Sequence, residues 1–161
     1  MSNAISLPAD ELQGPLAWTS DRLNDADWLV PLDGACEAEL MAASTILAAN
    51  PLPTLRLSPD DFALPRCRRL MAGVKAILDQ GVGFVILDRL PVEAWGRERA
   101  VQVYWLLAAM LARPVAQKWD GTMIYDVRDT GRKPGNGVRP DVTNVEQNYH
   151  TDNSYNLCPP D

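Results

Sequence analysis

The sequence predicts an α+β fold in which a helical N-terminal part, about residues 20–112, precedes strands and loops over about residues 113–161. Apolar residues recur with the helical period through much of the first part. Beyond Pro114 this period gives way to short runs separated by Gly and Pro. The 161 residues are 47% hydrophobic and 22% charged, which is typical of one soluble globular domain, so we expect residues 1–161 to form a single domain.

Two helices are expected in the first fifty residues. A short one over residues 21–28 has Thr19 or Ser20 as its N-cap. A longer one runs from about Ala35 to Ala49, with Asp33 as its cap and Asn50-Pro51 as its end. Its apolar stripe is expected to contain Leu40, Ala43, Ile46 and Leu47.

Further helix starts follow. Residues 58–61, Ser-Pro-Asp-Asp, place an N-cap before a proline and an acid, so we expect one helical turn there. Pro65 begins another helix, and Gly81 ends it. The apolar face of that helix is expected to consist of Leu70, Met71, Val74, Ile77 and Leu78.

A strand and a long helix are expected next. Residues 83–87, Gly-Phe-Val-Ile-Leu, form a short apolar run typical of a strand buried on both faces. Residues 92–111 have helical spacing, and Pro114 lies beyond their end. The stripe of this helix is expected to contain Trp95, Val101, Tyr104, Leu107, Ala108 and Leu111.

The last third of the chain is expected to begin with a hairpin. Residues 115–118 and 122–128 have the pattern of short strands, and Asp120-Gly121 between them is typical of a tight turn. A loop rich in Gly and Pro follows over residues 131–140, and loops of this length are often functional. It lacks the Lys-Ser/Thr of a P-loop, so we do not expect a phosphate site.

Composition excludes several classes of partner. The net charge is -6 and no run of Lys or Arg occurs, which argues against nucleic acid. The N-terminus has no basic and apolar leader, and the longest apolar run, residues 103–112, is too short to span a bilayer. Three widely spaced cysteines indicate neither a disulfide framework nor a zinc knuckle. We therefore expect a cytoplasmic protein with no membrane partner.

His150 and Asp152 carry the main chemical signal. His150 is the only histidine, and a spacing of two places it on the same strand face as Asp152. An imidazole nitrogen and a carboxylate oxygen placed in this way suit two positions of a 2-His-1-carboxylate iron site. On the tripeptide alone, a hydrogen-bonded structural pair is the commoner outcome.

The surroundings of the pair add a resemblance. They are a Gly-x-Gly-Phe-hydrophobic strand over residues 81–87, Leu90-Pro91, a long helix and a Thr-Asn…His-Thr-Asp…Pro-Pro segment over residues 143–160. With Gly14-Pro15 and Trp18, this succession resembles the N-terminal half of the taurine dioxygenase-like TauD/TfdA family. The resemblance covers roughly residues 14–161, and His-Thr-Asp followed by Asn153 is its sharpest element.

The resemblance implies a fold and an activity. The fold would be a helical N-terminal half with the first strands of a double-stranded β-helix (jelly-roll) that is incomplete in this chain. The activity would be that of a dioxygenase, an oxidoreductase that uses Fe(II), 2-oxoglutarate and O2 to hydroxylate a small organic substrate. His150 and Asp152 would be metal ligands.

Weaker candidates lie beside the pair. Asn144, Gln147 and Asn148 are candidates for binding substrate or supporting the metal ligands, although polar residues on a strand are more often plain surface. Arg139 is a candidate for meeting an acidic substrate, although a solvated arginine is the commoner outcome.

The site is incomplete in this chain. One histidine cannot supply two His ligands, and the family's arginine for 2-oxoglutarate lies C-terminal to His-x-Asp. We expect the chain to be a portion of a longer enzyme whose missing C-terminal half supplies them; a truncated gene product and a second polypeptide that supplies the other half are the alternatives. A homo-oligomer is a further possible assembly, and we expect little turnover by this chain alone. The alternatives are an inactive fragment or interaction module in which His150 and Asp152 are structural, and a zinc hydrolase that recruits Cys158.

Overall fold

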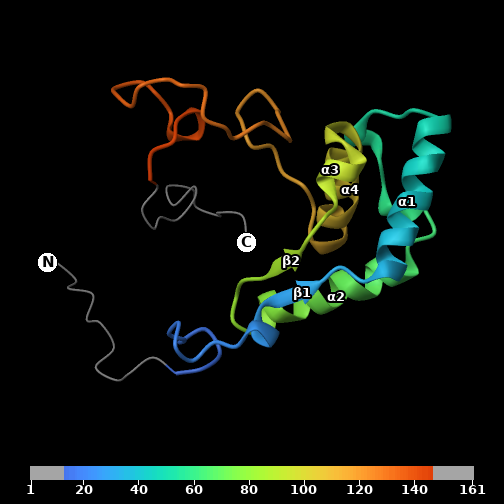
Figure 1. Cartoon of the computed structure of the whole chain (residues 1–161), viewed down its shortest axis with the longest axis horizontal. Coiled ribbons are helices and arrows are strands. Elements are labelled where there is room, and N and C mark those ends of the chain that lie inside the picture. The colour runs from blue at the N-terminus through green and yellow to red at the C-terminus, as the bar shows by residue number, and fades with distance from the viewer. Residues whose placement is uncertain (1–12, 147–161) are drawn as a thin grey trace, which may run out of the picture. The chain divides into compact units, whose positions relative to one another are not determined.

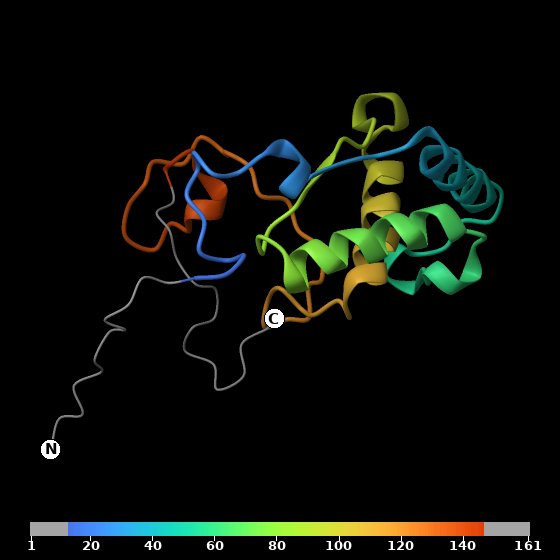
Figure 2. The same cartoon turned by 90° about the horizontal axis from the view of Figure 1, so that it is seen from below.

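The computed structural model describes residues 13–146. The chain divides into two compact units, residues 1–115 and residues 116–161. The first unit contains the long helices of the described residues, which lie together in both views of the fold (Figures 1 and 2). Within the described residues, no helix is both long and apolar enough to cross a membrane.

Helix α1, Gly34–Ala49, confirms the expected helix and its cap. The Asp33 carboxylate accepts a hydrogen bond from the Cys36 amide at 2.7 Å, which satisfies one of the free N–H groups of the first turn. Leu40, Ala43 and Leu47 are buried as expected. Ile46 is 54% exposed, so its place in the buried stripe was wrong. Cys36 and Ser44 are buried in its place.

Two short 3-10 helices, η2 (Thr54–Arg56) and η3 (Pro59–Asp61), follow and pack against helix α4, Arg97–Leu111. The start of η3 confirms the turn expected at residues 58–61. The Ser58 hydroxyl accepts from the Asp60 amide at 3.2 Å, and the Ser58 amide donates to the Asp61 carboxylate at 3.3 Å. The two bonds are reciprocal, so this turn is specified locally.

Helix α2, Pro65–Gln80, begins and ends where the sequence predicts, with Gly81 as its C-cap. Met71 and Val74 are buried, while Leu78 is 36% exposed. An unexpected contact holds its N-terminus. The Glu39 carboxylate, from α1, accepts from the Arg66 amide at 2.9 Å and from the Cys67 amide at 3.0 Å. A side chain of one helix therefore caps another.

The expected helix over residues 92–111 is divided into α3, Val92–Trp95, and α4. Gly96 between them has φ 73°, a left-handed conformation that a continuous helix does not contain. The buried face of α4 also differs from the expectation. Tyr104 is 57% exposed and Trp105 is 8% exposed, so the true stripe is rotated by one residue there.

The first unit is completed by a two-stranded parallel pair, β1 (Leu29–Pro31) with β2 (Ile86–Asp88), in which Val30 lies opposite Leu87. The strand expected at residues 83–87 is thus displaced, and its expected burial on both faces was wrong because Ile86 is 51% exposed. Phe84 lies outside the strand. Its ring centroid is 5.2 Å from that of Trp18 and 5.9 Å from that of Trp28.

Two other expected elements are absent from the described residues. The helix expected at residues 21–28 is only the single turn η1, Asp25–Asp27, whose N-cap is Asn24 rather than Thr19 or Ser20. Residues 115–118 and 122–128 form no strand. The tight turn at residues 118–121 is present, with Gly121 at φ 87°, but the Gln117–Thr122 hydrogen bond of 2.7 Å is not continued into a ladder.

The hydrophobic core lies among α1, α2 and α4. Leu64 and Leu106 are each 1% exposed, and the apolar run at residues 103–112 forms part of a buried helix as expected. The core side chains on the three helices are Cys36, Leu40, Ala43, Leu47, Cys67, Met71, Val74, Ala100, Val103, Trp105, Leu106 and Leu107.

Candidate functional site

The predicted metal ligands His150 and Asp152 lie outside the described residues, as do Gln147 and Asn148. Asn144 is described, and it is exposed two residues after the short 3-10 helix η4, Pro140–Val142. The site can therefore be followed in the structure only as far as the segment that leads into it.

Hydrogen bonds fix the backbone of this leading segment. The Arg128 amide donates to the Asp141 carbonyl at 3.1 Å, and the Thr130 amide donates to the Val142 carbonyl at 3.0 Å. The Thr130 hydroxyl donates to the same Val142 carbonyl at 2.8 Å. Residues 128–130 therefore lie beside η4.

Local contacts also shape η4 itself. Pro140 occupies its first position, where a missing N–H group costs nothing. The Thr143 hydroxyl donates to the Pro140 carbonyl at 2.9 Å, which closes the turn just before Asn144. The sequence Pro-Asp-Val-Thr thus specifies a single closed turn at residues 140–143.

Arg139, the candidate for an acidic substrate, is engaged locally. Its Nε donates to the Asp141 carboxylate at 3.0 Å, and the Asp141 side chain is only 13% exposed. This hydrogen bond and the negative charge of Asp141 raise the pKa of the Arg139 guanidinium above its ordinary value. The pair therefore stabilises the η4 turn, and a substrate would compete with Asp141 for this cation.

By their chemical type, the side chains of His150 and Asp152 suit part of an iron site. A histidine and a carboxylate two residues apart suit two corners of a facial triad, and the third corner needs a second His that the 161 residues do not contain. Among the described residues 13–146, no three His, Cys, Asp or Glu side chains gather at one point that could hold a metal.

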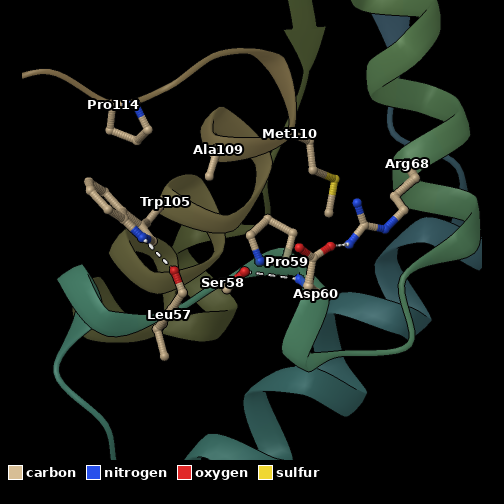
Figure 3. Close-up of a pocket in the computed structure, with 9 residues that line it drawn as sticks. All are labelled: Leu57, Ser58, Pro59, Asp60, Arg68, Trp105, Ala109, Met110 and Pro114. Atoms are coloured by element: carbon tan, nitrogen blue, oxygen red, sulfur yellow. Dashed lines mark hydrogen bonds and ion pairs between the residues drawn. The ribbon is translucent and has the colours of Figure 1, made fainter.

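The first unit contains a hollow that the sequence did not indicate. It has a volume of about 350 Å³ and lies between the η3 segment and α4, as Figure 3 shows. One side presents the apolar side chains of Pro59, Trp105 and Met110, and Arg68 reaches across from α2 to Asp60. The full lining is Leu57, Ser58, Pro59, Asp60, Arg68, Trp105, Ala109, Met110 and Pro114.

The polar groups that line this hollow form an ion pair and hydrogen bonds with one another. Arg68 and Asp60 form an ion pair at 2.6 Å, and the Trp105 indole N–H donates to the Leu57 carbonyl at 3.0 Å. The Ser58 hydroxyl caps η3 and has no histidine or carboxylate arranged to activate it among the lining residues. The arrangement is structural, and we assign no chemistry to it.

Sequence reasoning missed this hollow because its parts come from three separate segments. Residues 58–61 were identified correctly as a helix start, which already explains why Ser, Pro and Asp occur there. Trp105 is not among the residues expected on the buried face of its helix, although it is 8% exposed, donates to the Leu57 carbonyl and lines the hollow.

Comparison with known proteins gives a partial relationship. No protein-family model matches the chain. The chain is 26% identical over 142 residues to FR-33289 synthase of Streptomyces rubellomurinus, an alignment that includes 86% of this chain. It spans 42% of that protein, less than half of its length. Over most of its own length, therefore, the chain is similar to part of an enzyme.

Proposed function

We propose that this chain carries one part of the iron site of an Fe(II)- and 2-oxoglutarate-dependent dioxygenase that hydroxylates a small organic substrate. The observation that carries the proposal is His150-Thr151-Asp152, followed by Asn153 and set after a helical N-terminal part. The similarity of most of the chain to a protein named a synthase supports an enzymatic role.

His150 and Asp152 would each contribute one ligand. His150 would bind the metal through a neutral ring nitrogen, and the other ring nitrogen would then need a hydrogen-bond acceptor to hold its orientation. Asp152 would supply an anionic oxygen, the hard donor that complements an imidazole at Fe(II). When bound, Fe(II) with 2-oxoglutarate and O2 supplies the oxidising power for C–H hydroxylation.

Nearby polar residues would support these ligands. Asn144 is exposed directly after the η4 turn, so it is free to face a bound molecule. We propose that Asn144, Gln147 and Asn148 orient substrate or hold the metal ligands by hydrogen bonds. The second His and the 2-oxoglutarate-binding arginine would come from a C-terminal half of a jelly-roll, or from another polypeptide.

The proposal is tested by metal binding to the chain itself. We expect Asp152→Asn to weaken the binding of Fe(II), measured by anaerobic calorimetry, by at least about tenfold, because it removes an anionic ligand. His150→Ala should have an effect of the same order. Adding 2-oxoglutarate to the Fe(II)-loaded wild type should produce a weak visible charge-transfer band that both variants lack.

Glu146→Gln is the matched control. It removes the same charge from an exposed side chain a few residues upstream, so its Fe(II) affinity should stay within about twofold of the wild type. Equal affinities for all four proteins would contradict the iron site. In that case the interaction module, in which His150 and Asp152 are structural, would be the better description.

A further inference from the structure

Two buried cysteines on different helices point toward each other. Cys36 lies in the first turn of α1 and Cys67 in the first turn of α2, and both are 0% exposed. Their Sγ atoms are 2.6 Å apart, and the Cys67 thiol also lies 3.4 Å from the Cys36 carbonyl. Both cysteines are free thiols in the structure.

The backbone of each cysteine is anchored by a carboxylate. The Cys36 amide donates to Asp33 at 2.7 Å, and the Cys67 amide donates to Glu39 at 3.0 Å. Because Glu39 belongs to α1 and Cys67 to α2, this second bond also fixes the two helix starts against each other. The position of the two sulfurs is thus set by the helix caps rather than by flexible side chains alone.

A covalent bond needs only a small further approach. A disulfide is about 2.05 Å long, so the two sulfur atoms would have to move together by only about half an ångström. By this distance, the two sulfur atoms lie close to bonding separation.

We propose that Cys36 and Cys67 are a disulfide-forming pair that joins α1 to α2 when the chain meets a disulfide oxidant such as oxidised glutathione. The thiolate of one cysteine attacks the oxidant, forms a mixed disulfide and releases one glutathione thiolate. The second cysteine then displaces the other. Two protein thiols lose two electrons to the oxidant, and their two protons pass to the two glutathione thiolates.

Burial determines when this reaction occurs. Desolvation raises the pKa of both thiols, so the nucleophilic thiolate is scarce in the folded protein. Exchange should therefore be fast during refolding, while the thiols are open to solvent, and slow in the native state. Once formed, the bond would be shielded from reductants by the same core.

The test compares chain refolded with reduced and oxidised glutathione against chain refolded with dithiothreitol. After rapid alkylation of free thiols, trypsin should release residues 23–56 joined to the dipeptide Cys67-Arg68 only from the first sample. Cys158→Ser should behave in the same way, because Cys158 takes no part. Cys36→Ser should abolish the joined peptide.

Stability provides a second readout that does not depend on the variants. The bond would close a segment of about thirty residues, so the melting temperature of the oxidised wild type should exceed that of the reduced wild type by on the order of 10 °C. Complete alkylation of Cys36 and Cys67 at every glutathione ratio, or a bond from either one to Cys158, would overturn the proposal.

Discussion

Trp105 is a buried residue whose one polar side-chain atom, the indole nitrogen, has a hydrogen-bond partner. Its ring is 8% exposed, and its indole N–H donates to the Leu57 carbonyl at 3.0 Å. Leu57 itself is 5% exposed, so its carbonyl has little access to water. This one bond connects α4 with the segment between η2 and η3.

We expect Trp105→Phe to lower the free energy of unfolding by about 1–3 kcal/mol, because it leaves a buried carbonyl unpaired and a small void. Urea denaturation would measure the change. Trp119→Phe is the matched control, since Trp119 is 100% exposed and its replacement should change the free energy by less than about 0.5 kcal/mol. Equal effects would show that the Leu57 bond contributes nothing.

Residues whose role is local were predicted well from the sequence. Asp33, Ser58, Pro65 and Gly81 start or end helices because of their own hydrogen-bonding groups or backbone preferences, and the structure places each as expected. Tyr104 was placed wrongly. Which of several neighbouring apolar side chains is buried depends on the partner helices, and the periodicity of one segment does not contain that information.

At the level of elements, Glu39 connects two helices by capping α2 from α1. Its carboxylate receives two amide hydrogen bonds at the helix end that carries partial positive charge. We expect Glu39→Ala to reduce the free energy of unfolding by about 1–2 kcal/mol, as the loss of a helix cap does. Chemical denaturation followed by circular dichroism would measure it.

The control for this change is Glu146→Ala, which removes an exposed glutamate outside the helices. It should leave the free energy of unfolding within about 0.5 kcal/mol of the wild type. If Glu39→Ala were equally silent, the cap would be replaced by water at no cost, and the α1–α2 contact would rest on apolar packing alone.

Interruptions of helices and the positions of strands were predicted less well than the starts of helices. Helical spacing continues through residues 92–111, yet Gly96 in the left-handed region divides the segment. Strand β1 was not expected, because Leu29–Pro31 is too short for any alternation to be visible. Its existence depends on pairing with β2, far along the chain.

At the scale of the whole chain, the two units differ in how many of their described side chains are buried. Among residues 13–146, all buried core side chains belong to residues 36–107, and none from 116 to 146 is buried. Residues 116–146 are organised by turns and by hydrogen bonds between neighbouring backbone segments. Its local stability should therefore be much lower than that of the helical unit.

Hydrogen exchange measured by mass spectrometry tests this difference. We expect amides in α1, α2 and α4 to exchange at least about a hundredfold more slowly than those of residues 116–146. Comparable protection in both units would mean that something covers the second unit in solution, such as a second copy of the chain or another polypeptide.

The candidate site was predicted from residue chemistry together with the family resemblance of its surroundings. His150 and Asp152 attract attention because of their types and spacing, but a metal site requires ligands brought together from distant segments. With one histidine in the chain, no local pattern can specify the remaining ligand. The resemblance implies that a second His comes from elsewhere, and the Fe(II)-binding experiments test the two ligands that this chain contains.

The cap from Glu39 has a consequence for the order of folding. The first turn of α2 has its amide groups satisfied by a residue 27 positions earlier in the chain. That turn consequently gains its full stability only when α1 is already beside it, so we expect the two helices to form in one concerted kinetic step. In stopped-flow measurements, Glu39→Ala should slow refolding more than it speeds unfolding.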